Sequence, residues 1–115
     1  MQKIEEKIVA LMGGGRAVNC GQNVTKLSVR DTVYTEPGYI GIKLWDTIIC
    51  AIDTEKRYFT VNSGGWRTPT TKSRLHVIIQ NLKGFGYGLR QRKGEWYLIT
   101  PEGEVNFRDG MRLIY

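Results

Sequence analysis

One segment with a helical repeat is enclosed by stretches with the repeat of β-strands, and this arrangement constrains the fold most. Within residues 69–83, apolar side chains recur at the spacing of a single helix face. They are Leu75, Ile78, Ile79 and Leu82. Thr68 or Thr70 can cap this helix, and Gly84 can end it. A helix inserted between strands predicts an α+β fold.

Strand-like segments separated by turn signals lie on both sides of this helix. Residues 39–45 alternate with a period near two, and residues 47–52 form a nearly continuous apolar run, which is typical of a strand covered on both faces. Further strands are expected within 24–33 and at 57–62, 87–92, 96–100, 105–108 and 111–115. Asp109-Gly110 predicts a hairpin between the last two. The sequence therefore predicts a single α+β domain over residues 1–115, with an antiparallel β-sheet, an N-terminal helix and one helix inserted at about residues 69–83.

Residues 1–12 have the pattern of a short amphipathic helix. Ile4, Ile8 and Leu11 fall on one face, and the glycines at 13–15 end the pattern. A helix of this length is marginal by itself in water, so it must dock on its own sheet or on another subunit. We expect the second arrangement, in which residues 1–12 are an oligomerisation element and the protein is a homo-oligomer.

The chain is basic, with 17 Lys and Arg residues against 11 Asp and Glu residues, a formal net charge of +6 and a pI near 9.5. This balance favours an anionic partner. No apolar run has the length of a membrane span, and the N-terminus lacks the apolar core of a signal peptide. Two cysteines do not make a disulfide framework. We therefore expect a cytoplasmic protein with no membrane partner.

Residues 56–93 hold nine Lys or Arg residues and no Asp or Glu. In the middle of this span, residues 62–74 combine glycines, hydroxyl side chains, arginines and Trp66. Glycines can leave backbone N–H groups free, arginines supply fixed charge and an indole offers a stacking face. The pattern thus predicts a site for a phosphate attached to a planar base, with Trp66 and Arg67 as candidates. The alternative is a solvated basic loop whose Trp66 packs into the core.

Three other segments supply candidate ligand-binding residues. Arg16 follows three glycines and could reach a phosphate, although the glycines could also be a flexible hinge. Residues 84–93 interleave aromatic and basic side chains, which suits base stacking but also an ordinary solvent-facing strand. Arg108 and Arg112 flank a tight turn and could hold a diphosphate, unless Arg108 only pairs with Asp109. The full set of candidates is Arg16, Trp66, Arg67, Phe85, Tyr87, Arg90, Arg108 and Arg112.

The sequence gives little support for catalysis. His76 is the sole histidine and has no serine or cysteine partner at a motif-like spacing. Cys20 and Cys50 with one histidine do not make a zinc site. We expect a protein that is not an enzyme and that needs no metal or cofactor.

Several motifs resemble a family of small bacteriophage and prophage proteins. They are Asn62-Ser63-Gly64-Gly65-Trp66-Arg67-Thr68, Thr70-Thr71-Lys72-Ser73-Arg74, Gln91-Arg92-Lys93-Gly94-Glu95-Trp96-Tyr97 and Phe107-Arg108-Asp109-Gly110-Met111. In size and organisation the chain is also similar to the first Thoeris anti-defence family. That resemblance implies a sponge that sequesters cyclic ADP-ribose-type immune signals in the cytoplasm of an infected bacterial host; some such sponges also hold cyclic oligonucleotides between subunits. It assigns no binding residue, because the family's binding residues do not align with this sequence one by one.

The residues and the resemblance together predict a phage protein that binds a nucleotide immune signal without cleaving it. One alternative is a phage nucleic-acid-binding protein that uses the same basic and aromatic surface. Another is an inhibitor that binds a host protein. Polymer binding should fall steeply with salt because counterions are released, whereas an enclosed small nucleotide should be less sensitive.

Overall fold

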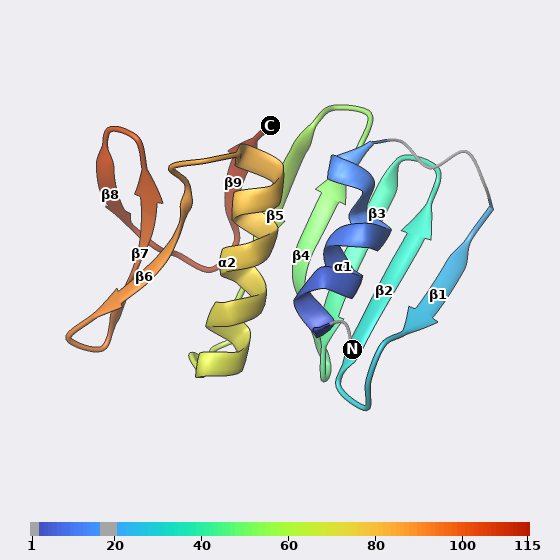
Figure 1. The fold of residues 1–115 in the computed structure, drawn as a ribbon, viewed down its shortest axis with the longest axis horizontal. Coiled ribbons are helices and arrows are strands. Elements are labelled where there is room, and N and C mark those ends of the chain that lie inside the picture. The colour runs from blue at the N-terminus through green and yellow to red at the C-terminus, as the bar shows by residue number, and fades with distance from the viewer. Residues whose placement is uncertain (1–2, 17–20) are drawn as a thin grey trace.

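A six-stranded antiparallel sheet, two helices on one of its faces and a separate three-stranded sheet make up the domain (Figure 1). The computed structural model describes residues 3–16 and 21–115. The helical elements are α1 Ile4–Met12, a short 3-10 turn η1 Gly13–Gly15 and α2 Pro69–Lys83. The strands are β1 Asn23–Lys26, β2 Asp31–Glu36, β3 Tyr39–Leu44, β4 Thr47–Asp53, β5 Tyr58–Val61, β6 Gly88–Arg92, β7 Glu95–Thr100, β8 Gly103–Asn106 and β9 Met111–Ile114. The predicted α+β fold is confirmed, with the inserted helix at the predicted residues; the part of the first predicted helix at residues 1 and 2 lies outside the described residues.

The small sheet pairs only strands that are consecutive in the chain, whereas the large sheet also pairs β5 with the distant β9. The large sheet has the order β1-β2-β3-β4-β5-β9, and the small sheet has the order β6-β7-β8. Between β6 and β7, Lys93 and Gly94 both have positive φ, at 52° and 80°, as a two-residue type I′ hairpin requires. This turn lies between the strands that the sequence predicts at residues 87–92 and 96–100.

The turn at Asp109-Gly110 does not form the predicted hairpin. β8 pairs with β7, whereas β9 leaves the small sheet and pairs with β5. The Asp109 carboxylate accepts hydrogen bonds from the backbone N–H and the hydroxyl of Ser63, both at 2.8 Å, and the Gly110 N–H donates to the Val61 carbonyl at 2.7 Å. These contacts hold the turn beside the end of β5, so β9 continues along β5 instead of folding back on β8.

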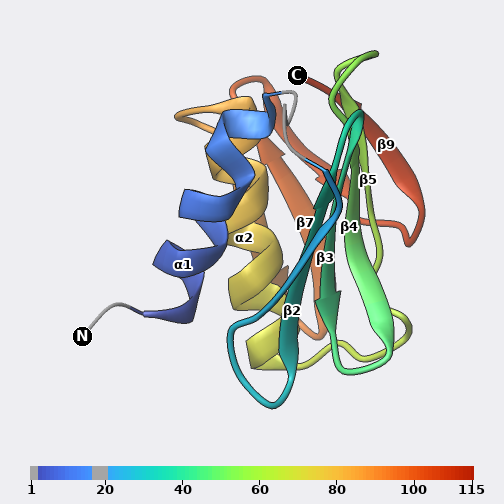
Figure 2. The ribbon, with the colours of Figure 1, turned by 90° about the vertical axis from the view of Figure 1, so that its right-hand side faces the viewer.

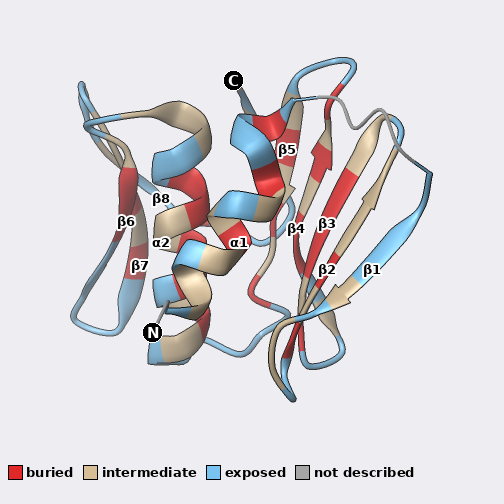
Figure 3. Ribbon diagram, turned by 45° about the vertical axis from the view of Figure 1, so that its right-hand side comes forward, coloured by how far each residue is buried: buried red, intermediate tan, exposed pale blue. Residues whose placement is uncertain are grey.

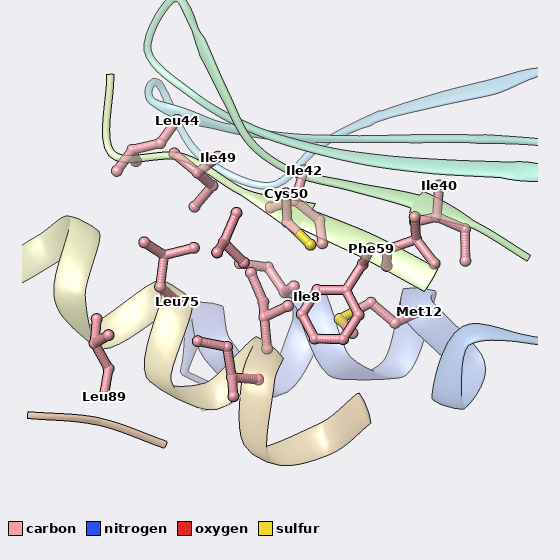
Figure 4. Close-up of a cluster of buried hydrophobic side chains, with 14 of the residues drawn as sticks. Ile8, Met12, Ile40, Ile42, Leu44, Ile49, Cys50, Phe59, Leu75 and Leu89 are labelled. Atoms are coloured by element: carbon pink, nitrogen blue, oxygen red, sulfur yellow. The ribbon is translucent and has the colours of Figure 1, made fainter. Parts of the chain in front are cut away.

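The core lies between the large sheet and the two helices, which cover one face of the sheet (Figure 2). Buried residues face each other across this layer (Figure 3). Figure 4 shows Ile8 and Met12 of α1 and Leu75 of α2 against the sheet residues Ile42 and Phe59. Burying each large side chain of this kind stabilises the fold by roughly 1.5–3 kcal/mol. α2 also packs against β6, so the same helix joins the small sheet to the large one.

The apolar face of α1 is covered within the chain. Ile8 and Met12 are both 1% exposed, and Ile4 and Leu11 pack against the same core. The face therefore does not supply the subunit contact expected for residues 1–12, because α2 and β2 already bury it. The homo-oligomer stays a prediction, without this helix as its support.

The strand β4 is covered on one face only, which corrects the expectation for residues 47–52. Ile48 lies on the outer face and is 37% exposed. The register shifts between Ile42 and Lys43, and this bulge allows the consecutive residues Ile49 and Cys50 both to be buried. No helix or strand in the described part of the chain covers the outer face (Figure 2). The apolar run reflects the bulge, not a second covering layer.

A buried ion-pair network ties α2 to the sheet and to α1. The Arg74 guanidinium donates to the two oxygens of Asp31 at 2.8 and 3.3 Å and also to Glu5, which accepts a further bond from the Ser73 hydroxyl. The side chains of Arg74 and Asp31 are only 6% and 2% exposed. Burial by itself raises the pKa of the Asp31 carboxyl, but the hydrogen bonds from Arg74 and Ser28 and the Arg74 charge outweigh it, so that pKa lies below its ordinary value.

Candidate functional site: a tryptophan-lined cleft

An open cleft lies where the β3–β4 turn meets the loop before α2. Both of these segments lie at the lower end of the domain in Figure 1. Its volume of about 520 Å³ falls within the range of about 300–1,000 Å³ that is usual for small-molecule sites. It is lined by Arg30, Leu44, Trp45, Asp46, Thr47, Ile49, Ser63, Trp66, Thr68, Thr70 and Thr71. We call it the tryptophan cleft.

Two exposed indoles from different parts of the chain line this cleft. Trp45 is 62% exposed and Trp66 is 69% exposed. Trp66 therefore does not pack into the core, and the alternative reading of a buried tryptophan is wrong. Leaving two large aromatic side chains in water at one cavity forgoes much of the free energy their burial would give. Such a pair is typical of a surface that binds a planar partner.

The backbone of Trp45 supports the same conclusion. Trp45 opens the two-residue turn between β3 and β4 and has φ of 54°, a left-handed conformation that is unfavourable for a bulky residue. Glycine is the usual residue where the first position of such a turn has positive φ. A hydrogen bond from the Trp45 N–H to the Arg30 carbonyl at 2.8 Å holds the turn in place. Strained residues of this kind cluster at functional sites.

The glycine loop before α2 binds itself and leaves few free donors. The Gly64 N–H donates to the Asn62 side chain at 2.7 Å, and the Gly65 N–H donates to the Ser63 hydroxyl at 3.2 Å. The Trp66 N–H donates to the Ser63 carbonyl at 3.0 Å. The expectation that these glycines present free N–H groups to a phosphate is therefore wrong, because neighbouring polar side chains already use them.

Gly64 instead allows the loop to approach the start of β4. It has φ of 64°, and a Cβ there would lie 2.6 Å from Oγ1 and 2.8 Å from Cγ2 of Thr47, a cleft residue. Gly64→Ala is expected to lower the free energy of unfolding by about 1–3 kcal/mol, measured by urea titration. Gly65→Ala is the matched control, since Gly65 has φ of 83° but no atom within 4 Å of its Cβ position. Equal losses in both variants would show that close packing at Gly64 is unimportant.

The charge in the cleft is mixed. Arg30 lines it with a side chain 43% exposed, and its Nε lies 3.8 Å from Asp31, a long contact that leaves the guanidinium able to bind an anion. Asp46 adds an exposed carboxylate. At the N-terminus of α2, the Thr68 hydroxyl accepts the Thr71 N–H at 3.2 Å, so the helix contributes mainly its dipole. This combination suits a ligand with an aromatic ring, hydroxyl or amino groups and a phosphate.

Several sequence candidates lie away from the cleft. Phe85 and Tyr87 follow the C-terminus of α2, while the cleft lies at its N-terminus, and a helix of 15 residues is about 22 Å long. Arg16 lies near the same far end, because the neighbouring Gly15 contacts Leu82 and accepts a hydrogen bond from the Tyr115 hydroxyl. Phe85 and Tyr87 therefore cannot stack on the same base as Trp66 within a single chain.

The remaining arginine candidates have different surroundings. Arg90 forms an ion pair with Glu104 at 2.7 Å on the small sheet, and Arg112 lies on β9 with its guanidinium 4.2 Å from the centre of the Tyr58 ring. Arg67 and Arg108 are exposed; the Arg67 guanidinium lies over the Phe107 ring, and the turn that contains Arg108 is held to the cleft residue Ser63 through Asp109. The glycines before Arg16 form a packed turn with Gly15 buried, not a free hinge.

Trp45, Arg30 and Asp46 are cleft residues that the sequence does not predict. The signal for Trp45 was a bulky aromatic residue in a two-residue turn between strands, where glycine or asparagine is common. Arg30 had no local signal, because only the docking of the turn brings it to Trp66.

The chain matches the Kyanoviridae Gp96 protein family over residues 1–114 and therefore belongs to that family of bacteriophage proteins. The predicted phage origin is confirmed, while no link to Thoeris anti-defence proteins is shown. No curated protein and no solved structure matches the chain. No helix among the described residues is long and apolar enough to cross a membrane. Within residues 3–16 and 21–115 no group of three or more His, Cys, Asp or Glu side chains could hold a metal ion.

Proposed function

We propose that this phage protein is an anti-defence protein that captures a compact nucleotide immune signal, of the cyclic ADP-ribose type, in the tryptophan cleft and does not cleave it. The observation that carries the proposal is the pair of exposed indoles, Trp45 and Trp66, at one cavity. A purine stacked on such rings gains about 1–3 kcal/mol per base. Arg30 and the N-terminal dipole of α2 would attract the phosphate, and Asp46 would accept hydrogen bonds from ribose hydroxyl or amino groups.

The surroundings of His76 support a role in binding without cleavage. Its Nδ1 accepts a hydrogen bond from the Leu89 N–H at 3.0 Å, between α2 and β6. A Cβ at Gly88 would lie 2.5 Å from its ring, so the imidazole is closely packed. An imidazole held in this way serves the packing of the small sheet, not proton transfer in the cleft.

The test is to mix the protein with a panel of nucleotides that includes a cyclic ADP-ribose isomer, and to measure affinity by equilibrium dialysis. The protein is then denatured and the released ligand analysed. We expect the intact ligand, recovered in stoichiometric amount. A cleaved product would make the protein an enzyme, and no binding by any member of the panel would contradict the proposal.

Trp66→Ala is expected to weaken nucleotide binding by about 5- to 150-fold, the equivalent of about 1–3 kcal/mol of lost stacking. Phe85→Ala is the matched control, because Phe85 is an aromatic residue that is 97% exposed at the other end of α2. It should bind as tightly as the wild type. Equal effects of the two substitutions would show that the tryptophan cleft is not the nucleotide-binding site.

Nucleic-acid binding is the second candidate, because basic side chains surround the same end of the domain. Lys72 in the first turns of α2 donates to Gln91 of β6 at 3.1 Å, which places Arg92 and Lys93 near that end. Binding to a single-stranded polymer would strengthen with strand length and fall steeply between low and high salt. Tight, salt-sensitive binding of DNA or RNA without binding of any small nucleotide would favour this candidate.

A further inference from the structure

Arg67 does not line the tryptophan cleft, and its side chain lies against two other aromatic rings. Its guanidinium carbon lies 5.2 Å from the centres of both the Trp96 and the Phe107 rings. These two rings pack edge to face and are 1% and 4% exposed. Stacking on aromatic faces fixes the position of a guanidinium while its N–H groups at the edge stay available to an anion.

Among the described residues, Arg67 and Arg108 have no carboxylate partner, as is also true of Arg57 and Arg112. Arg74 binds Asp31 and Glu5, and Arg90 and Arg92 both bind Glu104. In the part of the chain that the structure describes, neither Arg67 nor Arg108 has a carboxylate oxygen within 4 Å of its guanidinium. The nearest carboxylate in sequence, that of Asp109, is bound to the backbone and side chain of Ser63. The expected alternative, in which Arg108 pairs with Asp109, is therefore wrong.

These two arginines adjoin the cleft. Arg67 follows Trp66, whose indole lines it. Ser63, another lining residue, holds the turn that contains Arg108 through its hydrogen bonds to Asp109. The Arg67 guanidinium lies over the Phe107 ring, and Arg108 is the next residue along the chain, so the two arginines are close to each other in the fold.

We propose that Arg67 and Arg108 form a second anion subsite beyond Trp66, so that the ligand of the tryptophan cleft carries a further phosphate linked to its nucleotide. This inference rests on the proposed function, since it extends the same cleft. The shared chemistry is a second phosphate on a purine nucleotide, and it can come from a diphosphate or from a phosphodiester to a second nucleotide. In either form the base lies in the cleft and the further phosphate lies against the guanidinium groups of Arg67 and Arg108.

The probes are AMP, ADP and the linear dinucleotide pApA, with affinities measured by equilibrium dialysis at one fixed salt concentration. The wild type is expected to bind ADP or pApA at least about tenfold more tightly than AMP, the effect of one charge-assisted hydrogen bond. A gain with ADP identifies a diphosphate, and a gain with pApA alone identifies a phosphodiester. Arg67→Met and Arg108→Met should each remove most of this gain and leave the AMP affinity unchanged.

Arg90→Met is the control, because Arg90 is an exposed arginine that Glu104 already pairs. It should retain the full preference. Arg67→Met keeps an aliphatic side chain over Trp96, and an unchanged urea midpoint would show that the packing survives. If AMP binds but neither ADP nor pApA binds more tightly, the subsite is wrong and the proposed function stands. If none of the probes binds and the full nucleotide panel also fails, both are wrong.

Discussion

Arg74→Ala is expected to lower the free energy of unfolding by about 3–5 kcal/mol, because it leaves the buried Asp31 carboxylate without its partner. The measurement is chemical denaturation at neutral pH. Arg90→Ala removes an ion pair of similar length from a side chain that is 57% exposed, and it should cost only about 0–1 kcal/mol. A loss at Arg74 as small as the loss at Arg90 would show that burial of the pair does not matter.

The ion-pair network of Arg74 also predicts how the stability of the fold decreases at low pH. Hydrogen bonds and the Arg74 charge hold the pKa of Asp31 below its ordinary value despite its burial, and the pKa of Glu5 is lowered in the same way. A carboxyl group with a lower pKa in the folded state contributes its full stability above its unfolded pKa of about 4, and it loses that contribution as the pH falls through the folded pKa. The wild type should therefore lose stability below about pH 4 more steeply than a folded Arg74 variant.

Replacing both cleft tryptophans, as Trp45→Gly with Trp66→Ala, is expected to weaken nucleotide binding at least about 30-fold, since each ring contributes about 1–3 kcal/mol of stacking. The measurement is equilibrium dialysis with the nucleotide of highest affinity in the panel. Retention of wild-type affinity by the double variant would contradict the proposed site.

The Trp45→Gly substitution alone separates binding from folding. Because Trp45 is 62% exposed and has φ of 54°, glycine loses little buried area and relieves a backbone conformation that costs about 1–2 kcal/mol. Its free energy of unfolding should equal or exceed that of the wild type while its affinity falls. A destabilised Trp45→Gly protein would instead indicate that the indole is retained for the fold.

Local chemistry explains which features the sequence predicts well. The segment 69–83 carries its own apolar stripe, and Thr68 caps it through a hydrogen bond from the Thr71 N–H, so the helix follows from residues within a few positions of each other. The turn at Lys93-Gly94 is equally local. Trp66 is likewise predicted from its own segment, as an indole within a basic loop.

The tertiary structure decided the features that depend on distant residues. The Asp109-Gly110 turn allows a hairpin, but hydrogen bonds to Ser63 and Val61 place β9 beside β5. The amphipathic pattern of α1 predicts that one face of the helix is buried, but it does not predict which surface covers that face. In this chain α2 and β2 cover it.

The features of the cleft also separate into those that the sequence predicts and those that only the fold decides. The sequence by itself determined a helix start near residue 69 and a basic loop that contains Trp66, because each depends on interactions between neighbouring residues. Only the tertiary structure brought Arg30 and Trp45 to Trp66 and left the Trp66 indole exposed. The hydrogen bonds of the Gly64 and Gly65 N–H groups to Asn62 and Ser63 are local, although the sequence did not predict them. Many distant side chains could pack against the same groups, and which arrangement buries the most apolar surface is a property of the whole fold.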